Sequence, residues 1–142
     1  DHFDDERSHL IAAIIKKMSV AKKYGLPTVN IWGDGMARRE FLCTDVFVSM
    51  IHKIIAKIDQ CPTYVNTGLG RDYSITEYYE FVAAALDYRG SFIYDTSKPV
   101  GMRQKLVDIT TLEAMECFVP SDTKVKIEET SRYFMEHFAD EL

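Results

Sequence analysis

Apolar residues recur at helical spacing in several stretches of the chain. Residues 8–24 place apolar side chains on one stripe and lysines on the opposite face, which predicts a helix that Gly25 ends. The capping-box sequence Ser74-Ile75-Thr76-Glu77 predicts the start of another helix, which runs to about residue 86. A final amphipathic helix is expected over about 124–138, after Pro120 breaks the chain.

A further helix is predicted over 45–58, with Thr44 as its cap, and its first three turns carry almost no polar side chain. A helix that is apolar on most sides needs cover on more than one side. Periodicity supports two interpretations equally: a central core helix, or a helix that packs on a surface outside this chain.

Short runs of β-forming residues separate the helices. Residues 28–32 are expected to form a strand that ends at the Gly33-Asp34-Gly35 turn, and further short strands are expected at 39–43, 63–66 and 91–94. A second capping-box sequence, Thr110-Thr111-Leu112-Glu113, predicts a brief helix. Alternating β and α pieces indicate an α/β fold, with short parallel strands and packed helices in one domain over 1–142.

Charge, hydropathy and cysteine content exclude several kinds of partner and site. The 142 residues carry a formal net charge of −5, which argues against a nucleic-acid partner because such proteins need a basic face. No apolar run approaches the ~20 residues of a membrane span, and no signal peptide is visible. The widely spaced Cys43, Cys61 and Cys117 suggest free thiols in a reducing compartment, and no pair has zinc-ligand spacing. We therefore expect a cytoplasmic protein without a bound metal.

Neither glycine turn has the form of a dinucleotide-binding fingerprint. Gly33-Asp34-Gly35 follows a strand, but no third glycine and no helix come next. The loop Gly68-Leu69-Gly70 fails in the same way, because the next helix begins only near Ser74. Tyr94 is the only tyrosine with a lysine four residues later, Lys98, and this pair falls at the end of the strand expected over 91–94 and in the loop after it, not on a helix. Reductase chemistry that needs such a pair on one face of a helix is therefore expected to come from residues outside this chain.

The residues suited to a ligand are cations and one indole. Arginine and lysine bind a diphosphate through charge-assisted hydrogen bonds, and a tryptophan can stack on a base or sugar. Taken singly, each is more often a solvated surface cation or a core aromatic residue. His9, at the start of the first helix, suits a proton shuttle near neutral pH, or it is simply a structural residue of the helix start. The cations and the indole are Lys16, Lys17, Trp32, Arg38, Arg39, Lys98, Arg103 and Lys105.

Taken in order, several motifs give the chain a family resemblance. The blocks are Ser8-His9-Leu10-Ile11, Trp32-Gly33-Asp34-Gly35 with Arg39-Glu40-Phe41-Leu42, Val65-Asn66-Thr67-Gly68-Leu69-Gly70 with Ser74-Ile75-Thr76-Glu77, and Asp95-Thr96-Ser97-Lys98-Pro99-Val100-Gly101 running into Lys105-Leu106-Val107-Asp108. With these blocks the chain resembles the C-terminal half of GDP-L-fucose synthases, which are extended short-chain dehydrogenases/reductases of the NAD-dependent epimerase/dehydratase superfamily.

This resemblance implies the substrate-binding portion of an NADP-dependent 3,5-epimerase/4-reductase. Such enzymes convert GDP-4-keto-6-deoxy-mannose to GDP-L-fucose. The resemblance places Lys17, Trp32, Arg39 and Lys105 at positions that bind the GDP-sugar. It places His9 at the position of an acid/base residue that also lies close to the nicotinamide. It further implies that a missing N-terminal half binds most of the NADP, that the segment around 45–66 packs on that half, and that the full-length protein is a homodimer while this portion alone is inactive.

Some positions depart from the family pattern. Lys17 stands where an arginine is usual, which keeps the charge but loses bidentate geometry. Val100 replaces a common aspartate, Cys43 a common histidine, and Arg103-Gln104 the usual Pro-Arg. A related GDP-deoxysugar or heptose, or a different nucleotide sugar, therefore stays open as the substrate. A non-catalytic sugar-nucleotide-binding or assembly module is the alternative of a different class.

Overall fold

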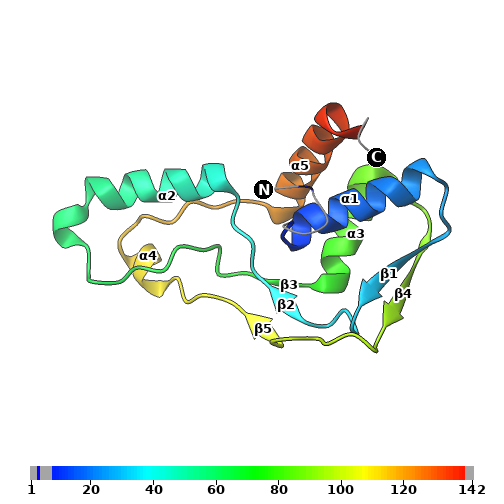
Figure 1. Cartoon of the computed structure of the whole chain (residues 1–142). Helices are drawn as coiled ribbons and strands as arrows, with labels where there is room; N and C mark the ends of the chain where they lie inside the picture. The colour runs from blue at the N-terminus through cyan, green and yellow to red at the C-terminus, as the bar shows by residue number, and fades with distance from the viewer. Residues whose placement is uncertain (1–2, 4–7, 140–142) are drawn as a thin grey trace.

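A computed structural model describes residue 3 and residues 8–139 of the chain (Figure 1). The helices and strands alternate as an α/β fold requires. In chain order they are α1 (Leu10–Lys23), β1 (Thr28–Trp32), β2 (Arg38–Arg39), α2 (Thr44–Ala56), the 3-10 helix η1 (Ile58–Gln60), β3 (Tyr73–Ser74), α3 (Ile75–Leu86), β4 (Ser91–Asp95), β5 (Gln104–Lys105), α4 (Thr110–Ala114) and α5 (Thr123–His137).

The strands form two small sheets. In one, β1 and β4 run parallel, in a register that starts at Thr28 with Ser91 and ends at Trp32 with Asp95. In the other, β2 lies between β3 and β5. The β2–β5 pair is parallel and the β2–β3 pair is antiparallel, so the expectation of parallel strands is correct for two of the pairs and wrong for the third.

Helices α1, α3 and α5 pack together over β1 and form the larger hydrophobic core (Figure 1). The stripe of α1 predicted from the sequence faces this core, because Ile14, Ile15 and Met18 are almost completely buried. From β1, only the alternate residues Val29 and Ile31 are buried, as expected for a strand covered on one face.

A second, smaller core lies on the other side of β2, β3 and β5, around α2 and α4 (Figure 1). Val46, Met50 and Ile54 of α2 pack there against Leu112 and Cys117. The opposite face of α2 remains exposed although it is apolar, and it includes Phe47, Val48 and Ile55, with exposed fractions of 40%, 44% and 59%.

Two helix boundaries match the signals in the sequence. At the end of α1, Gly25 adopts φ +61°, and the Leu26 N–H donates to the Ala21 carbonyl at 2.9 Å. This geometry satisfies the last carbonyls of the helix, and glycine adopts it without a steric penalty. At the start of α3, the predicted capping box forms, because the Glu77 N–H donates to Ser74 Oγ and the Ser74 N–H donates to Glu77 Oε2.

Other boundaries differ from the predictions. Cys43 is the N-cap of α2, and Thr44 is the first residue of the helix. In the first turn, Asp45 Oδ1 accepts the hydrogen bond from the Val46 N–H. Ile109 caps α4 and the second capping box does not form, because the N–H and hydroxyl of Thr110 both donate to Asp108 Oδ1.

The shortest predicted strands also differ. The strand expected over 39–43 is only Arg38–Arg39, and within the described residues 63–66 form no strand. Residues 63–66 lie beside the second core, where an Asn66 side-chain bond to the Asp108 carbonyl takes the place of strand pairing.

Candidate functional site

The small sheet brings two of the predicted binding residues together. Arg39 of β2 and Lys105 of β5 are partners in the parallel register, although 65 residues separate them in the chain. The Arg38 N–H donates to the Arg103 carbonyl at 2.7 Å and the Glu40 N–H donates to the Lys105 carbonyl at 3.2 Å. Both backbone bonds hold β2 beside β5, so two cations from distant segments lie on neighbouring strands of one sheet.

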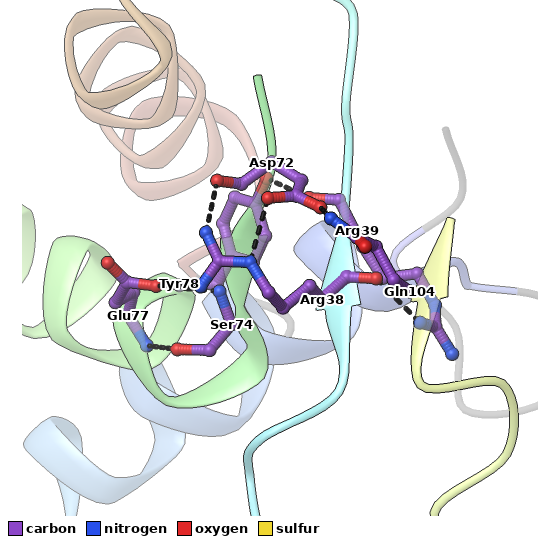
Figure 2. A network of polar contacts seen from close by, with 7 residues as sticks. All are labelled: Arg38, Arg39, Asp72, Ser74, Glu77, Tyr78 and Gln104. Carbon is purple, nitrogen blue, oxygen red and sulfur yellow. Dashed lines mark hydrogen bonds and ion pairs between the residues drawn. The ribbon is translucent and has the colours of Figure 1, made fainter. Parts of the chain in front are cut away.

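Arg38 is one residue away from Arg39, but its guanidinium group is bonded to acceptors of the protein itself. Its Nε donates to Asp72 Oδ1 at 2.8 Å and its Nη2 donates to the Asp72 carbonyl at 2.8 Å (Figure 2). Gln104 Nε2 donates to the other carboxylate oxygen, Asp72 Oδ2, at 2.6 Å. Burial alone would raise the pKa of Asp72, but the hydrogen bonds from Gln104 and Arg38 and the charge of Arg38 outweigh it and lower that pKa.

Glu40 holds the other end of the same sheet. Its Oε1 accepts hydrogen bonds from the N–H groups of Leu69 at 2.6 Å and Gly70 at 2.8 Å, and its Oε2 accepts one from the Val107 N–H at 3.0 Å. One carboxylate therefore joins β2, the glycine loop and the chain that follows β5. A carboxylate that accepts several backbone N–H groups is a strong anchor, because each bond is charge-assisted.

The other two predicted binding residues meet at the carboxyl end of β1. Lys17 Nζ donates to the Asn30 carbonyl at 3.0 Å and contacts the Tyr79 hydroxyl at 3.5 Å. It lies 5.9 Å from the ring centroid of Trp32, whose side chain is 67% exposed. Partial burial lowers the pKa of Lys17. Lys98 Nζ lies 5.6 Å from the same indole, so two cations flank one aromatic ring.

The loop between β4 and β5 runs from one pair to the other. Near Trp32, a Cβ added at Gly33 would lie 3.3 Å from the Val100 side chain. Near β2, a Cβ added at Gly101 would lie 3.7 Å from Arg39 Nη2. The loop thus connects the two pairs of predicted binding residues along one border of the molecule, at the carboxyl ends of the parallel strands where α/β folds commonly bind ligands.

His9 lies apart from these pairs. It is the N-cap of α1, is exposed, and its carbonyl accepts the Ala13 N–H at 3.0 Å. Eight residues of helix place it about 12 Å along the axis from Lys17. The structure therefore joins Lys17 to Trp32 and Arg39 to Lys105, and leaves His9 at the far end of α1. The roles of all five remain predictions.

Two depressions lie away from these residues. One of about 590 Å³ is lined by the C-terminal end of α1 and the first residue of β4, at the end of the β1–β4 sheet opposite Trp32. Another, of about 390 Å³, is lined by the first residues of α2 and α5 and by the chain that precedes α5. None of the five predicted site residues lines either depression. We place the candidate site at Trp32 and Arg39 because cations converge there.

Other kinds of site are not found in the described part of the chain. Within residues 3 and 8–139, no group of three or more His, Cys, Asp or Glu side chains could hold a metal ion. Over the same residues, no helix is both long and apolar enough to cross a lipid bilayer. Cys43, Cys61 and Cys117 are free thiols.

Sequence reasoning missed three residues that build the site. Asp72, Gln104 and Glu40 form hydrogen bonds with residues far from them in the chain, and nothing in their local sequence shows which partners they will meet. The sequence marks Lys98 only as one candidate cation among several, and its position beside Trp32 follows from the path of the β4–β5 loop.

A family model described as "NAD dependent epimerase/dehydratase family" matches residues 1–75. The chain belongs to that family. Among curated relatives, it is 45% identical to the GDP-L-colitose synthase of Yersinia pseudotuberculosis, over 95% of this chain and 44% of that protein. It is 42% identical to the GDP-L-fucose synthase of Azorhizobium caulinodans, over 95% of this chain and 43% of that protein. The chain thus spans less than half the length of these relatives and matches their C-terminal half.

The fold is also similar to that of solved structures of such enzymes. The chain superimposes on a GDP-L-fucose synthetase from Naegleria fowleri bound to NADP with a TM-score of 0.84, at 22% identity, over 97% of this chain and 43% of that one. The prediction of an α/β fold with short parallel strands and packed helices is confirmed. At this level of identity the likeness shows the fold alone.

Proposed function

We propose that this chain is the GDP-sugar-binding part of an NADP-dependent epimerase/reductase. The complete enzyme would convert GDP-4-keto-6-deoxy-mannose to GDP-L-fucose or make a close relative of that product. The names of the relatives, a colitose synthase and a fucose synthase, support a GDP-linked deoxysugar.

The observation that carries this proposal is the convergence of cations around Trp32 and Arg39. Arg39 and Lys105 are register partners, and Lys17 and Lys98 flank the indole. A diphosphate needs several cations at close range, and the Arg39 guanidinium provides bidentate geometry for one phosphate. Trp32 offers a largely exposed ring on which a base or sugar can stack.

The chain's own residues would divide the work between binding and proton transfer. The cations Lys17, Arg39 and Lys105 would hold the diphosphate. Trp32 would stack on the base or the sugar and so orient the ligand. His9 exchanges a proton at the carbons that are epimerised, which is a role that imidazole suits near neutral pH. NADP, when bound, supplies the hydride that reduces the ketone.

The nicotinamide site belongs, in this proposal, mainly to a part of the enzyme that this chain does not span. Gly33 and Gly35 lead into β2 and not into a helix, and β3 separates Gly70 from α3. Neither turn therefore offers a helix N-terminus to a pyrophosphate. The exposed apolar face of α2, with Phe47, Val48 and Ile55, would pack on that other part.

A binding experiment tests the proposal. In the complete protein, Arg39→Ala should weaken the binding of GDP-linked sugars by about 2 kcal/mol in calorimetry, because a charge-assisted bond to phosphate is lost. Arg89→Ala is the matched control, since Arg89 is exposed at the other end of the β1–β4 sheet. Unchanged affinity in Arg39→Ala would exclude Arg39 from the site.

A thermal-shift screen then identifies the nucleotide. GDP-sugars should raise the melting temperature of the complete protein, because a ligand that binds only the folded state stabilises it. A larger shift with UDP- or dTDP-sugars would contradict the assignment to GDP-sugars. A protein that binds a GDP-sugar but shows no turnover with NADPH would support the non-catalytic binding module instead.

A further inference from the structure

We propose that Asp72 and Gln104 are positioning residues that hold Lys105 in place beside Arg39 for the diphosphate. This inference rests on the proposed function, since it deals with the same binding residues. It assigns no ligand contact to Asp72 or Gln104 themselves, because both act through the strands that carry the cations.

The small sheet needs support from side chains. Each of β2, β3 and β5 is two residues long. Strands of this length form very few backbone hydrogen bonds, and an isolated short pair of strands is at best marginally stable in water. Two backbone bonds join β2 to β5, and the position of β5, with the backbone of Lys105, therefore depends on side-chain bonds as well.

Asp72 supplies those bonds to two strands at once. Its side chain is buried, with the residue only 8% exposed, and it precedes β3. Oδ2 accepts the bond from Gln104 of β5, and Oδ1 accepts the bond from Arg38 of β2, at 2.6 Å and 2.8 Å (Figure 2). One carboxylate thus links β5 to β2 across the sheet, and the Asp72 carbonyl adds a further bond to Arg38.

The alternation of side chains along β5 explains how the bond from Gln104 to Asp72 affects Lys105. Arg38 pairs with Gln104 and Arg39 pairs with Lys105 in the same parallel register. Successive side chains of a strand point to opposite faces, so the pair that faces Asp72 leaves the pair of cations on the opposite face. A displacement of Gln104 must move the adjacent Lys105 backbone.

The amide of Gln104 suits this role because it donates a hydrogen bond without adding charge. Gln104→Leu replaces the amide by an apolar side chain, which has no donor for Asp72. Gln104→Glu places a second carboxylate against Asp72, so repulsion should move β5 further. The matched control is Gln60→Leu, the same change at an exposed residue of η1.

The test is a double-mutant cycle in the complete protein, with GDP as the probe in calorimetry. Gln104→Leu should weaken GDP binding about fivefold to tenfold, and Gln60→Leu should leave it unchanged. In a Lys105→Ala background, Gln104→Leu should cause little further loss, because residues that act through one another are not additive. A purely structural role would lower the melting temperature without this non-additivity.

Hydrogen exchange gives a readout that does not depend on the ligand. Amides of residues 103–107 should exchange faster in Gln104→Leu than in the wild type or in Gln60→Leu. Unchanged exchange there would overturn the positioning role, and so would fully additive losses of GDP affinity. If exchange rises but Lys105→Ala binds GDP as the wild type does, the link to β5 stands and the proposed binding function fails.

Discussion

The carboxylate of Glu40 accepts a hydrogen bond from the Val107 backbone N–H at 3.0 Å, two residues beyond Lys105. It therefore fixes the chain after β5, as Asp72 fixes the chain at Gln104 before it. The same carboxylate also accepts the N–H groups of Leu69 and Gly70. Two acidic side chains thus bracket the segment that carries a predicted binding lysine.

Glu40→Gln should destabilise the protein by about 1–3 kcal/mol, because the amide nitrogen of glutamine would face a backbone N–H and leave it without an acceptor. Thermal or urea unfolding measures the effect. Glu113→Gln, at an exposed position of α4, provides the control and should change stability by less than about 0.5 kcal/mol. Equal effects in both variants would show that Glu40 is not an anchor.

The lowered pKa of Asp72 gives a pH dependence with a definite sign. A carboxyl group whose pKa is depressed in the folded state contributes stability above its unfolded pKa of about 3.9, and this contribution is lost as the pH falls through the folded value. Stability of Asp72→Asn should therefore fall less steeply below about pH 4 than that of the wild type. Acid unfolding measures the slope, and Asp59→Asn, an exposed change in η1, should keep the wild-type slope.

Replacement of Ser131 or Ser19 by alanine is expected to increase the stability of the protein. Both hydroxyls are buried and have no hydrogen-bond partner among the described residues. Replacing either serine by alanine should stabilise the protein by about 1 kcal/mol, since a buried polar group without a partner is costly and alanine favours a helix. Ser49→Ala should give no such gain, because Ser49 is exposed and its hydroxyl donates to the Asp45 carbonyl. A lower melting temperature in Ser131→Ala would contradict the expectation.

The proposed role of His9 predicts a change in hydrogen–deuterium exchange between substrate and solvent in the complete enzyme. His9→Gln should slow the uptake of solvent deuterium into the substrate, while reduction of an already epimerised sugar is affected less. Mass spectrometry of the recovered sugar measures the exchange. His137→Gln, a change in α5, is the control. Normal deuterium uptake in His9→Gln would remove His9 from proton transfer.

The larger elements could be predicted because each is specified locally. β1 begins and ends where the sequence indicates, and the capping box of α3 forms as expected. The ends of α1 follow from its stripe and from Gly25. Two-residue strands such as β3 and β5 carry no periodicity, so no local signal marks them. Their existence depends on partners at distant positions, which only the folded chain brings together.

In the candidate site, too, some residues can be predicted from the sequence and others only from the folded chain. Lys17, Trp32, Arg39 and Lys105 could be named because cations and an indole suit a diphosphate-linked base, and because the motifs resemble a known family. Asp72 and Gln104 are 32 residues apart, and each alone has the features of an ordinary polar loop residue. Their meeting through β5 is a tertiary event that sequence spacing does not reveal.

The dependence of the small sheet on side-chain bonds limits how the protein can be redesigned. Exchanging the segment 96–107 for that of a relative, in order to change the sugar accepted, would replace Gln104 but leave Arg38 and Asp72 in the host chain. The new segment would then meet a carboxylate already committed to one partner. A successful chimera must transfer residues 38, 72 and 104 as one set, although they come from three separate parts of the gene.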